Sequence, residues 1–271
     1  MKDTCVLTEY RITTHLPCSL KLGLVSDLHE SDPEDALILL KKEAPDLIMI
    51  AGDTLERHGG TKDTQRDVHE GKLERLLRHL LMKLDDIFEY LFGKRDHDPA
   101  YAWHFLEEAG KIAPVFLSPG NHEWYFLPKD LEIMKKAGVR LLNNADCVFS
   151  IKGGSIRIGG FSSVPDEKWL EEFGRKDGFK ILLCHHPEYY DRYLLGEKVD
   201  LVLAGHAHGG QIRIGNQGIY APGQGLFPHY TKGIYHEKML VTAGCSNTAS
   251  VPRLGNPREV VMVHLEGREK A

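Results

Sequence analysis

Short apolar runs separated by an amphipathic segment open the chain and predict an α/β fold. Residues 10–13 and 21–25 have the length and apolar character of strands, and residues 46–51 repeat that pattern. Between the last two runs, Asp32 is the expected N-cap of a helix and Pro33 lies in its first turn. A strand, a helix and a strand in this order predict a parallel pair joined by a right-handed crossover.

The most regular helical period lies in residues 70–92, where leucine, isoleucine and phenylalanine recur three and four positions apart. A helix packed on the core is the expected structure of this segment. A lid, a partner-binding surface or a peripheral membrane contact is the alternative, because the segment follows Asp53 and interrupts the polar motifs described below. With a second helix expected at residues 98–109, it forms a predicted helical insertion over residues 56–110.

The remainder of the chain is richer in strands than in helices. A strand at 114–117 and a helix at 128–137 are followed by strands at 147–151, 155–159, 180–184, 201–204, 211–214, 239–243 and 260–265. Short helices are expected at 167–173 and 187–193. The sequence contains no internal repeat and no low-complexity linker, so a single domain over residues 1–271 is expected.

Composition narrows the classes of partner and compartment. A hydrophobic fraction of 42% in 271 residues is ample for a globular core, and a net charge of −5 disfavours nucleic acid as the main partner. The five cysteines are scattered, which indicates reduced thiols. No leader sequence and no apolar run of membrane-spanning length is found, so a cytoplasmic location is expected.

Polar side chains directly follow several of the apolar runs. The candidates are Asp27, His29, Asp53, Asn121, His185, His206 and His208. They offer carboxylate, amide and imidazole atoms but no thiolate, a set that suits manganese, iron or zinc, with manganese favoured. Seven ligands are too many for one catalytic metal, which keeps about three protein ligands, so the set predicts two divalent metal ions.

Five motifs in order resemble the calcineurin-like metallophosphoesterase family. They are Asp27-x-His29, Gly52-Asp53, Gly120-Asn121-His122-Glu123, His185-x-Pro187 and Gly205-His206-x-His208. The resemblance covers nearly the whole chain. It implies a four-layer αββα sandwich in which two central sheets present metal-binding loops at one edge.

The same resemblance implies a role for each motif residue. Asp27, His29 and His208 would hold one metal, Asn121, His185 and His206 the other, and Asp53 would bridge the two. His122 would contact the scissile phosphate and protonate the leaving oxygen, with Glu123 or a neighbouring carboxylate orienting its ring. His186 is expected to be a packed residue or a support for a ligand.

Three arginines are candidates for contact with substrate. The segment from Gly52 to Arg57 resembles the Gly-Asp-x-Val-Asp-Arg turn of Ser/Thr protein phosphatases, in which the arginine clamps phosphate. Glu30, directly after His29, departs from that group, and a solvated surface arginine is the commoner role for Arg57. Arg213 and Arg253 carry the same two interpretations.

Residues 205–213 and 220–225 are similar to a narrower bacterial branch that includes YkuE-like phosphoesterases and UDP-2,3-diacylglucosamine pyrophosphatases. This resemblance implies a binuclear phosphohydrolase that cleaves a phosphodiester or pyrophosphate bond in a phosphorylated small molecule or nucleotide-linked substrate. The attack would be in line, by a metal-bridging hydroxide, with His122 as general acid. A phosphomonoesterase and a non-catalytic scaffold of the same fold are the alternatives, and the sequence leaves the oligomeric state open.

Overall fold

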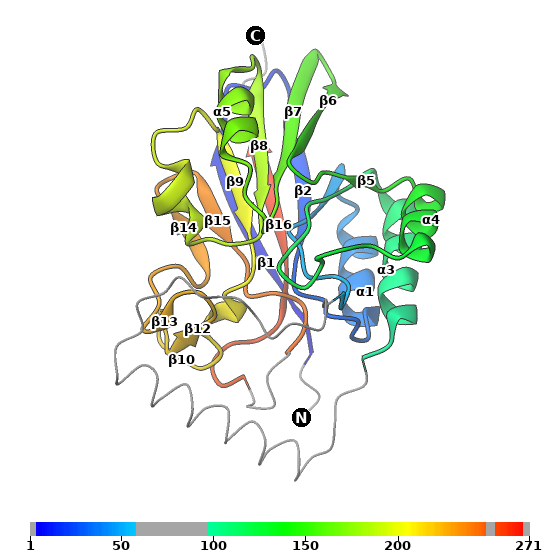
Figure 1. Cartoon of the computed structure of the whole chain (residues 1–271), viewed down its shortest axis with the longest axis vertical. Helices are drawn as coiled ribbons and strands as arrows, with labels where there is room; N and C mark the ends of the chain where they lie inside the picture. Colours follow the sequence, from blue (N-terminus) through cyan, green and yellow to red (C-terminus); the bar gives the residue numbers. More distant parts are fainter. Residues whose placement is uncertain (1–3, 58–96, 248–252, 268–271) are drawn as a thin grey trace.

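A computed structural model describes residues 4–57, 97–247 and 253–267, and its main feature is a pair of six-stranded sheets (Figure 1). The first sheet has the order β1-β16-β2-β3-β4-β5. Its strands are β1 (Val6–Thr13), β16 (Glu259–Glu266), β2 (Leu20–Val25), β3 (Leu47–Ile50), β4 (Val115–Leu117) and β5 (Arg140–Leu141). The predicted helix at 70–92 lies outside the described residues.

The second sheet has the order β14-β15-β9-β8-β7-β6. Its strands are β14 (Gly233–Tyr235), β15 (Met239–Val241), β9 (Leu201–Ala204), β8 (Phe179–Cys184), β7 (Gly154–Phe161) and β6 (Ala145–Ile151). Strands β15, β9, β8 and β7 are mutually parallel. In the first sheet, β2, β3, β4 and β5 are also mutually parallel, as the strand-helix-strand order predicts.

Helices cover the outer face of each sheet. On the first sheet lie α1 (Glu34–Glu43), α3 (Pro99–Ile112) and α4 (Pro128–Ala137), which stand together along one flank of the molecule (Figure 1). On the second lie α5 (Glu167–Arg175) and a π-helical turn, η1 (Tyr190–Leu194). The turn replaces the helix expected at 187–193. No helix in the described ranges has both the length and the apolar character needed to cross a bilayer.

Three apolar layers hold these elements together. Alternate residues of β3 divide between two of them: Ile48 and Ile50 face the helices, whereas Met49 faces the second sheet. The same alternation in β8 directs Leu183 between the sheets and Leu182 towards α5. Because successive side chains of a strand point to opposite faces, each sheet is covered twice, and the predicted four-layer αββα sandwich is confirmed.

Helix α3 is the helix expected at 98–109, and it contacts both α1 and α4 in the helical layer of the sandwich. One sequence expectation needs correction. The strand expected at 211–214 shrinks to β10 (Arg213–Ile214), paired with β11 (Gln217–Gly218), because a 3₁₀ turn, η2 (His208–Gly210), precedes it. A second small hairpin follows, formed by β12 (Tyr220–Ala221) and β13 (Gly225–Leu226).

Candidate metal centre

The predicted metal ligands follow the carboxyl ends of five strands of the two sheets. Loops after β2, β3 and β4 belong to the first sheet, and loops after β8 and β9 belong to the second. Parallel strands end at one edge of a sheet, so these five loops meet there.

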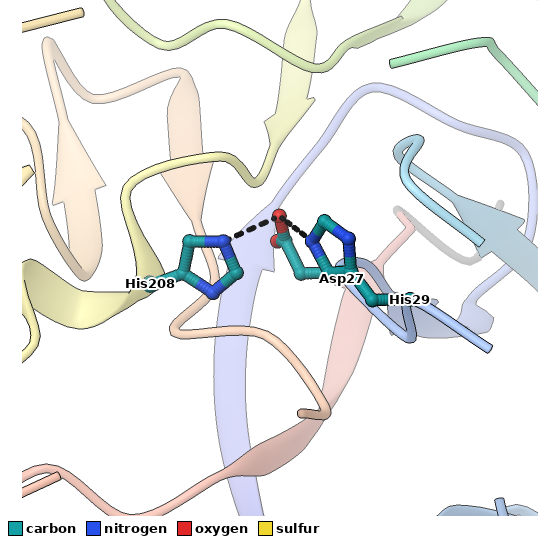
Figure 2. A group of neighbouring side chains, drawn as sticks. All are labelled: Asp27, His29 and His208. Carbon is teal, nitrogen blue, oxygen red and sulfur yellow. Dashed lines mark ion pairs between the residues drawn. The ribbon is translucent and has the colours of Figure 1, made fainter. Parts of the chain in front are cut away.

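Asp27, His29 and His208 form the first group of donors (Figure 2). The Oδ1 atom of Asp27 lies 3.4 Å from Nε2 of His208 and 3.7 Å from Nε2 of His29. All three side chains are almost completely buried. The figure shows both imidazole rings turned towards the one carboxylate, although His208 is 181 residues from Asp27 in the sequence (208 − 27).

Asp53 joins this group to a second one. Its Oδ2 atom lies 3.7 Å from Nε2 of His29 and 3.0 Å from Nε2 of His185. His206 has a ligand atom within 4.8 Å of those of Asp53 and His185, and Oδ1 of Asn121 lies 3.1 Å from Nε2 of His185. The seven predicted ligands are therefore brought together, in two groups that meet at Asp53.

The donor atoms themselves indicate that cations fit the site. Among the described residues, Nε2 of His29 and Oδ2 of Asp53 are buried and make no hydrogen bond of normal geometry. Leaving a buried polar atom unpaired costs about 1–3 kcal/mol, so two such atoms 3.7 Å apart require an explanation. Carboxylate oxygen and imidazole nitrogen are the donors that manganese, iron and zinc accept.

The loops hold the ligands in a strained backbone conformation. Five ligands have positive φ: Asp27 at 55°, His29 at 49°, Asp53 at 54°, His206 at 64° and His208 at 45°. This region is sparsely populated by residues other than glycine, and such strain concentrates at functional sites. Gly120 allows the close approach, since a Cβ there would lie 2.0 Å from Oδ1 of Asp53.

Buried charge sets the protonation of the ligands when no metal is bound. Burial opposes the charged form of His29, but Asp27 and Glu56 raise its pKa to about 10. Burial also opposes the charged form of His185, but Asp53 raises the pKa of this histidine to about 9. For His208, burial lowers the pKa to about 3. Without metal, the protons on His29 and His185 thus balance the negative charges of the buried carboxylates of Asp27 and Asp53. Divalent cations can take over this role.

The carboxylate partner of His122 is Glu56 and not Glu123. The Nδ1 atom of His122 lies 2.8 Å from Oε2 of Glu56, whose Oε1 lies 2.5 Å from Nδ1 of His29. Glu123 is turned away and accepts hydrogen bonds from the backbone amides of Asp53, Thr54, Leu55 and Gly120. Glu56 is therefore the neighbouring carboxylate that the sequence left as the alternative, and Glu123 supports the loop that carries Asp53.

The sequence did contain a signal for Glu56. It occupies the place of the second acidic residue in the Gly-Asp-x-Val-Asp-Arg turn that this segment resembles. Glu56 is half-buried, and although burial favours its neutral form, hydrogen bonds from His122 and His29 lower its pKa. The residue is therefore an ionised acceptor for both histidines.

Arg57 is buried and paired with two carboxylates. Only 4% of its surface is exposed, and its guanidinium makes two hydrogen bonds of 2.8 Å with Asp130 and one of 2.5 Å with Glu30. This pairing corrects the expectation of a solvated surface arginine. Asp130 lies in α4, so the arginine ties the Asp53 loop to the helical layer.

The other two arginines contact the loop that carries His208. Arg213 donates to the carbonyl oxygens of Gly209 and Asn216 and to the hydroxyl of Thr231, so it braces the turn after His208. Arg253 is placed closer to the ligands, with its Nη2 atom 3.3 Å from Nδ1 of His208.

A mixed α/β sandwich that gathers imidazoles and carboxylates at one sheet edge defines a class of metal-binding hydrolases. A family model described as calcineurin-like phosphoesterase matches residues 20–210, and the chain belongs to this family. It is a metal-dependent phosphoesterase, and the centre described above lies in the loops where the family motifs occur.

Individual proteins are similar to this chain over more than nine-tenths of its length. The chain is similar to the protein YpbG of Bacillus subtilis, with 28% identity over 92% of this chain and 82% of the relative. It is 25% identical to a metallophosphoesterase of Campylobacter jejuni, and the match covers 94% of this chain and 61% of that protein. Among solved structures, the sulfate thiohydrolase SoxB of a Thermus species matches with a TM-score of 0.44 and 11% identity, over 91% of this chain and 56% of SoxB.

Proposed function

We propose that the chain is a binuclear phosphohydrolase that cleaves a phosphodiester or pyrophosphate bond in a small-molecule or nucleotide-linked substrate. The observation that carries the proposal is the position of Oδ2 of Asp53, which is buried 3.7 Å from Nε2 of His29 and 3.0 Å from Nε2 of His185. A carboxylate atom placed between two groups of nitrogen donors is suited to bridging two cations.

In this proposal the two donor groups each hold one ion. Asp27, His29 and His208 would hold the first, Asn121, His185 and His206 the second, and Asp53 would be shared. Two divalent ions, manganese by preference and iron or zinc as alternatives, would lower the pKa of water and neutralise phosphate charge.

His122 has the geometry of a general acid. Its Nδ1 atom is engaged with Glu56, while Nε2 points towards the centre, 3.8 Å from Oδ2 of Asp53. Its side chain is 28% exposed, in contrast with the buried ligands, so a substrate can reach it. The contact with the Glu56 carboxylate fixes the orientation of the ring and leaves Nε2 as the nitrogen that would face the leaving oxygen.

The pairing of Arg57 favours a diester over a monoester. A phosphomonoester carries close to two negative charges, and the arginine that the resemblance places near phosphate would help to neutralise them. Here Glu30 and Asp130 already occupy that guanidinium. A phosphodiester, with one charge, makes less demand on further cationic groups.

The test is a comparison of substrates on metal-loaded protein. We expect bis-p-nitrophenyl phosphate to be hydrolysed with higher kcat/KM than p-nitrophenyl phosphate when manganese is added, with turnover lost in Asp53→Asn. Nucleotide-sugar diphosphates form the pyrophosphate arm of the assay. A higher kcat/KM on the monoester would refute the diester preference and favour the phosphomonoesterase alternative. Fully metal-loaded protein that turns over none of the three substrate types would refute the proposed function.

A further inference from the structure

Beyond the seven ligands, one carboxylate approaches the centre from outside. Glu188 lies two residues after His186 in the loop that follows β8. Its Oε1 atom is 3.8 Å from Nε2 of His206, and its Oε2 atom is buried without a hydrogen-bond partner among the residues described. Nε2 of His206 is also buried and lacks such a partner.

We propose that Glu188 is a positioning residue for the metal centre. Its carboxylate would accept the Nε2 hydrogen of His206 and so fix the orientation of the imidazole, leaving Nδ1 as the nitrogen that binds metal. Metal-bound histidines usually donate their second ring N–H to a carboxylate or carbonyl group, which also raises the basicity of the ligand. This inference rests on the proposed role of His206 as a ligand.

The neighbours of Glu188 hold it in place. Oε1 of Glu188 lies 3.1 Å from Nδ1 of His186, and Nε2 of His186 lies 3.0 Å from the hydroxyl oxygen of Ser163. The His186 ring is stacked on Tyr189 at 4.5 Å and 23°. Fixed on two sides, His186 keeps the carboxylate next to His206, whose ring centroid is 4.2 Å from its own.

Main-chain atoms of the loop at Gly223 also pack against Glu188 and His206. A Cβ atom added to Gly223 would lie 2.3 Å from Oε1 of Glu188 and 3.4 Å from Nε2 of His206. Gly223 also has a φ of 71°, in the region that favours glycine. The loop between β12 and β13 therefore covers the pair with main-chain atoms, and this limits the water that could compete for the His206 N–H.

A third metal ion is the competing interpretation, because His186, Glu188 and His206 could also surround a cation. Both nitrogens of His186 are already within hydrogen-bond distance of other groups. An ion at this place would displace one of these two contacts and share His206 with the second metal. The geometry consequently favours support of His206 over a separate ion.

The experiment measures manganese binding to metal-free protein by titration calorimetry, using the Glu188→Ala and Glu188→Gln variants. We expect one of the two equivalents to bind about 10- to 100-fold more weakly in Glu188→Ala, the usual effect of removing an outer carboxylate. Glu188→Gln should lose less, because the amide oxygen can still accept the N–H. Glu172→Ala, an exposed carboxylate of α5, is the matched control and should bind like the wild type.

A spectroscopic measurement separates positioning from a general structural role. In zinc-loaded protein, a ring N–H resonance that disappears in His206→Gln should exchange faster with solvent in Glu188→Ala, while the remaining ring signals are unchanged. If Glu188→Ala does not fold, as judged by circular dichroism, the same two measurements on Glu188→Gln decide the matter.

Three results would overturn the inference. Wild-type affinity for both equivalents in Glu188→Ala would exclude a positioning role. Three equivalents in the wild type and two in Glu188→Ala would show a third metal site. Unchanged exchange of the His206 resonance would show that Glu188 does not accept its hydrogen. Undiminished binding in His206→Ala would instead refute the proposed metal centre itself, so the two failures are distinguishable.

Discussion

Glu56 is the residue whose replacement tests the catalytic geometry most directly. One carboxylate joins His29, a proposed metal ligand, to His122, the proposed general acid, with distances of 2.5 and 2.8 Å. Glutamine has nearly the same shape but only one good acceptor atom. In Glu56→Gln, the Nδ1 hydrogen of either His29 or His122 therefore loses its acceptor and faces the amide NH₂ group of the new glutamine.

The size of the effect follows from the hydrogen bond that is lost. A hydrogen bond to a charged group contributes about 1.5–3 kcal/mol, and the side chain of Glu56 is only 20% exposed, so solvent compensates little. Each 1.4 kcal/mol is about tenfold, which predicts a decrease of roughly 10- to 150-fold in kcat/KM at saturating manganese. Glu56→Ala removes both acceptors and should be more impaired.

The assay compares two diesters that differ only in the leaving group. A p-nitrophenolate needs little protonation as it departs, whereas an alkoxide needs a great deal. If Glu56 acts through His122, the variant should lose more activity on an alkyl ester than on the p-nitrophenyl ester, and His122→Ala should show the same selectivity. Glu34→Gln is the matched control, because Glu34 pairs with His104 at 3.1 Å on the surface and should leave both rates unchanged.

Equal losses on the two esters, at saturating metal, would refute the link between Glu56 and proton transfer. Loss of manganese affinity without selectivity would mean that the contact with His29 dominates. Unchanged kinetics in Glu56→Ala would show that neither contact contributes to the reaction.

Three further predictions concern metal loading and stability. Gly120→Ala should weaken manganese binding about 10- to 100-fold in calorimetry, because the new Cβ would displace Asp53; wild-type affinity would contradict the close approach. Arg57→Met should lower the free energy of unfolding, measured in urea, by about 3–5 kcal/mol, since the buried carboxylates of Asp130 and Glu30 lose their cationic partner; a loss below about 1 kcal/mol would contradict this. Manganese should bind more tightly as pH rises towards 9–10, because the raised pKa values of His29 and His185 keep both protonated at neutral pH, and metal must displace these protons. Calorimetry in buffers of different ionisation enthalpy measures the released protons, and heats independent of buffer would contradict the assignment.

The resemblance of the five motifs to a known family implied the layers of the fold, and the sequence pattern indicated the residues that meet in the centre. The pattern could do so because parallel strands end at a common edge, and the polar residues of interest directly follow apolar runs such as 47–50 and 201–204. The pairs β10-β11 and β12-β13 were not predicted as hairpins. Each of their strands has two residues, which is too short to show a hydrophobic period.

The direction in which a motif residue's side chain points was harder to predict than the motif itself. Glu123 is next to His122 in the sequence, yet its side chain turns inward to four backbone amides, while Glu56 reaches His122 from 66 residues away. Burial raises the pKa of Glu123, and the surrounding backbone N–H groups offset this only in part. Sequence spacing does not specify which of two nearby carboxylates faces the solvent side of a loop and which supports it from beneath.

Arg57 shows how one neighbouring substitution changes the role of a motif residue. The turn that resembles Gly-Asp-x-Val-Asp-Arg is present, but Glu30 follows His29, and α4 contributes Asp130. A guanidinium fork held by two buried carboxylates cannot also form a bidentate contact with phosphate, because the same donors would be needed twice. The departure at Glu30 therefore converts a potential phosphate clamp into a brace for the Asp53 loop. In the proposed reaction, the metals and His122 would then have to neutralise the charge of the phosphate, and a singly charged diester makes the smaller demand on them.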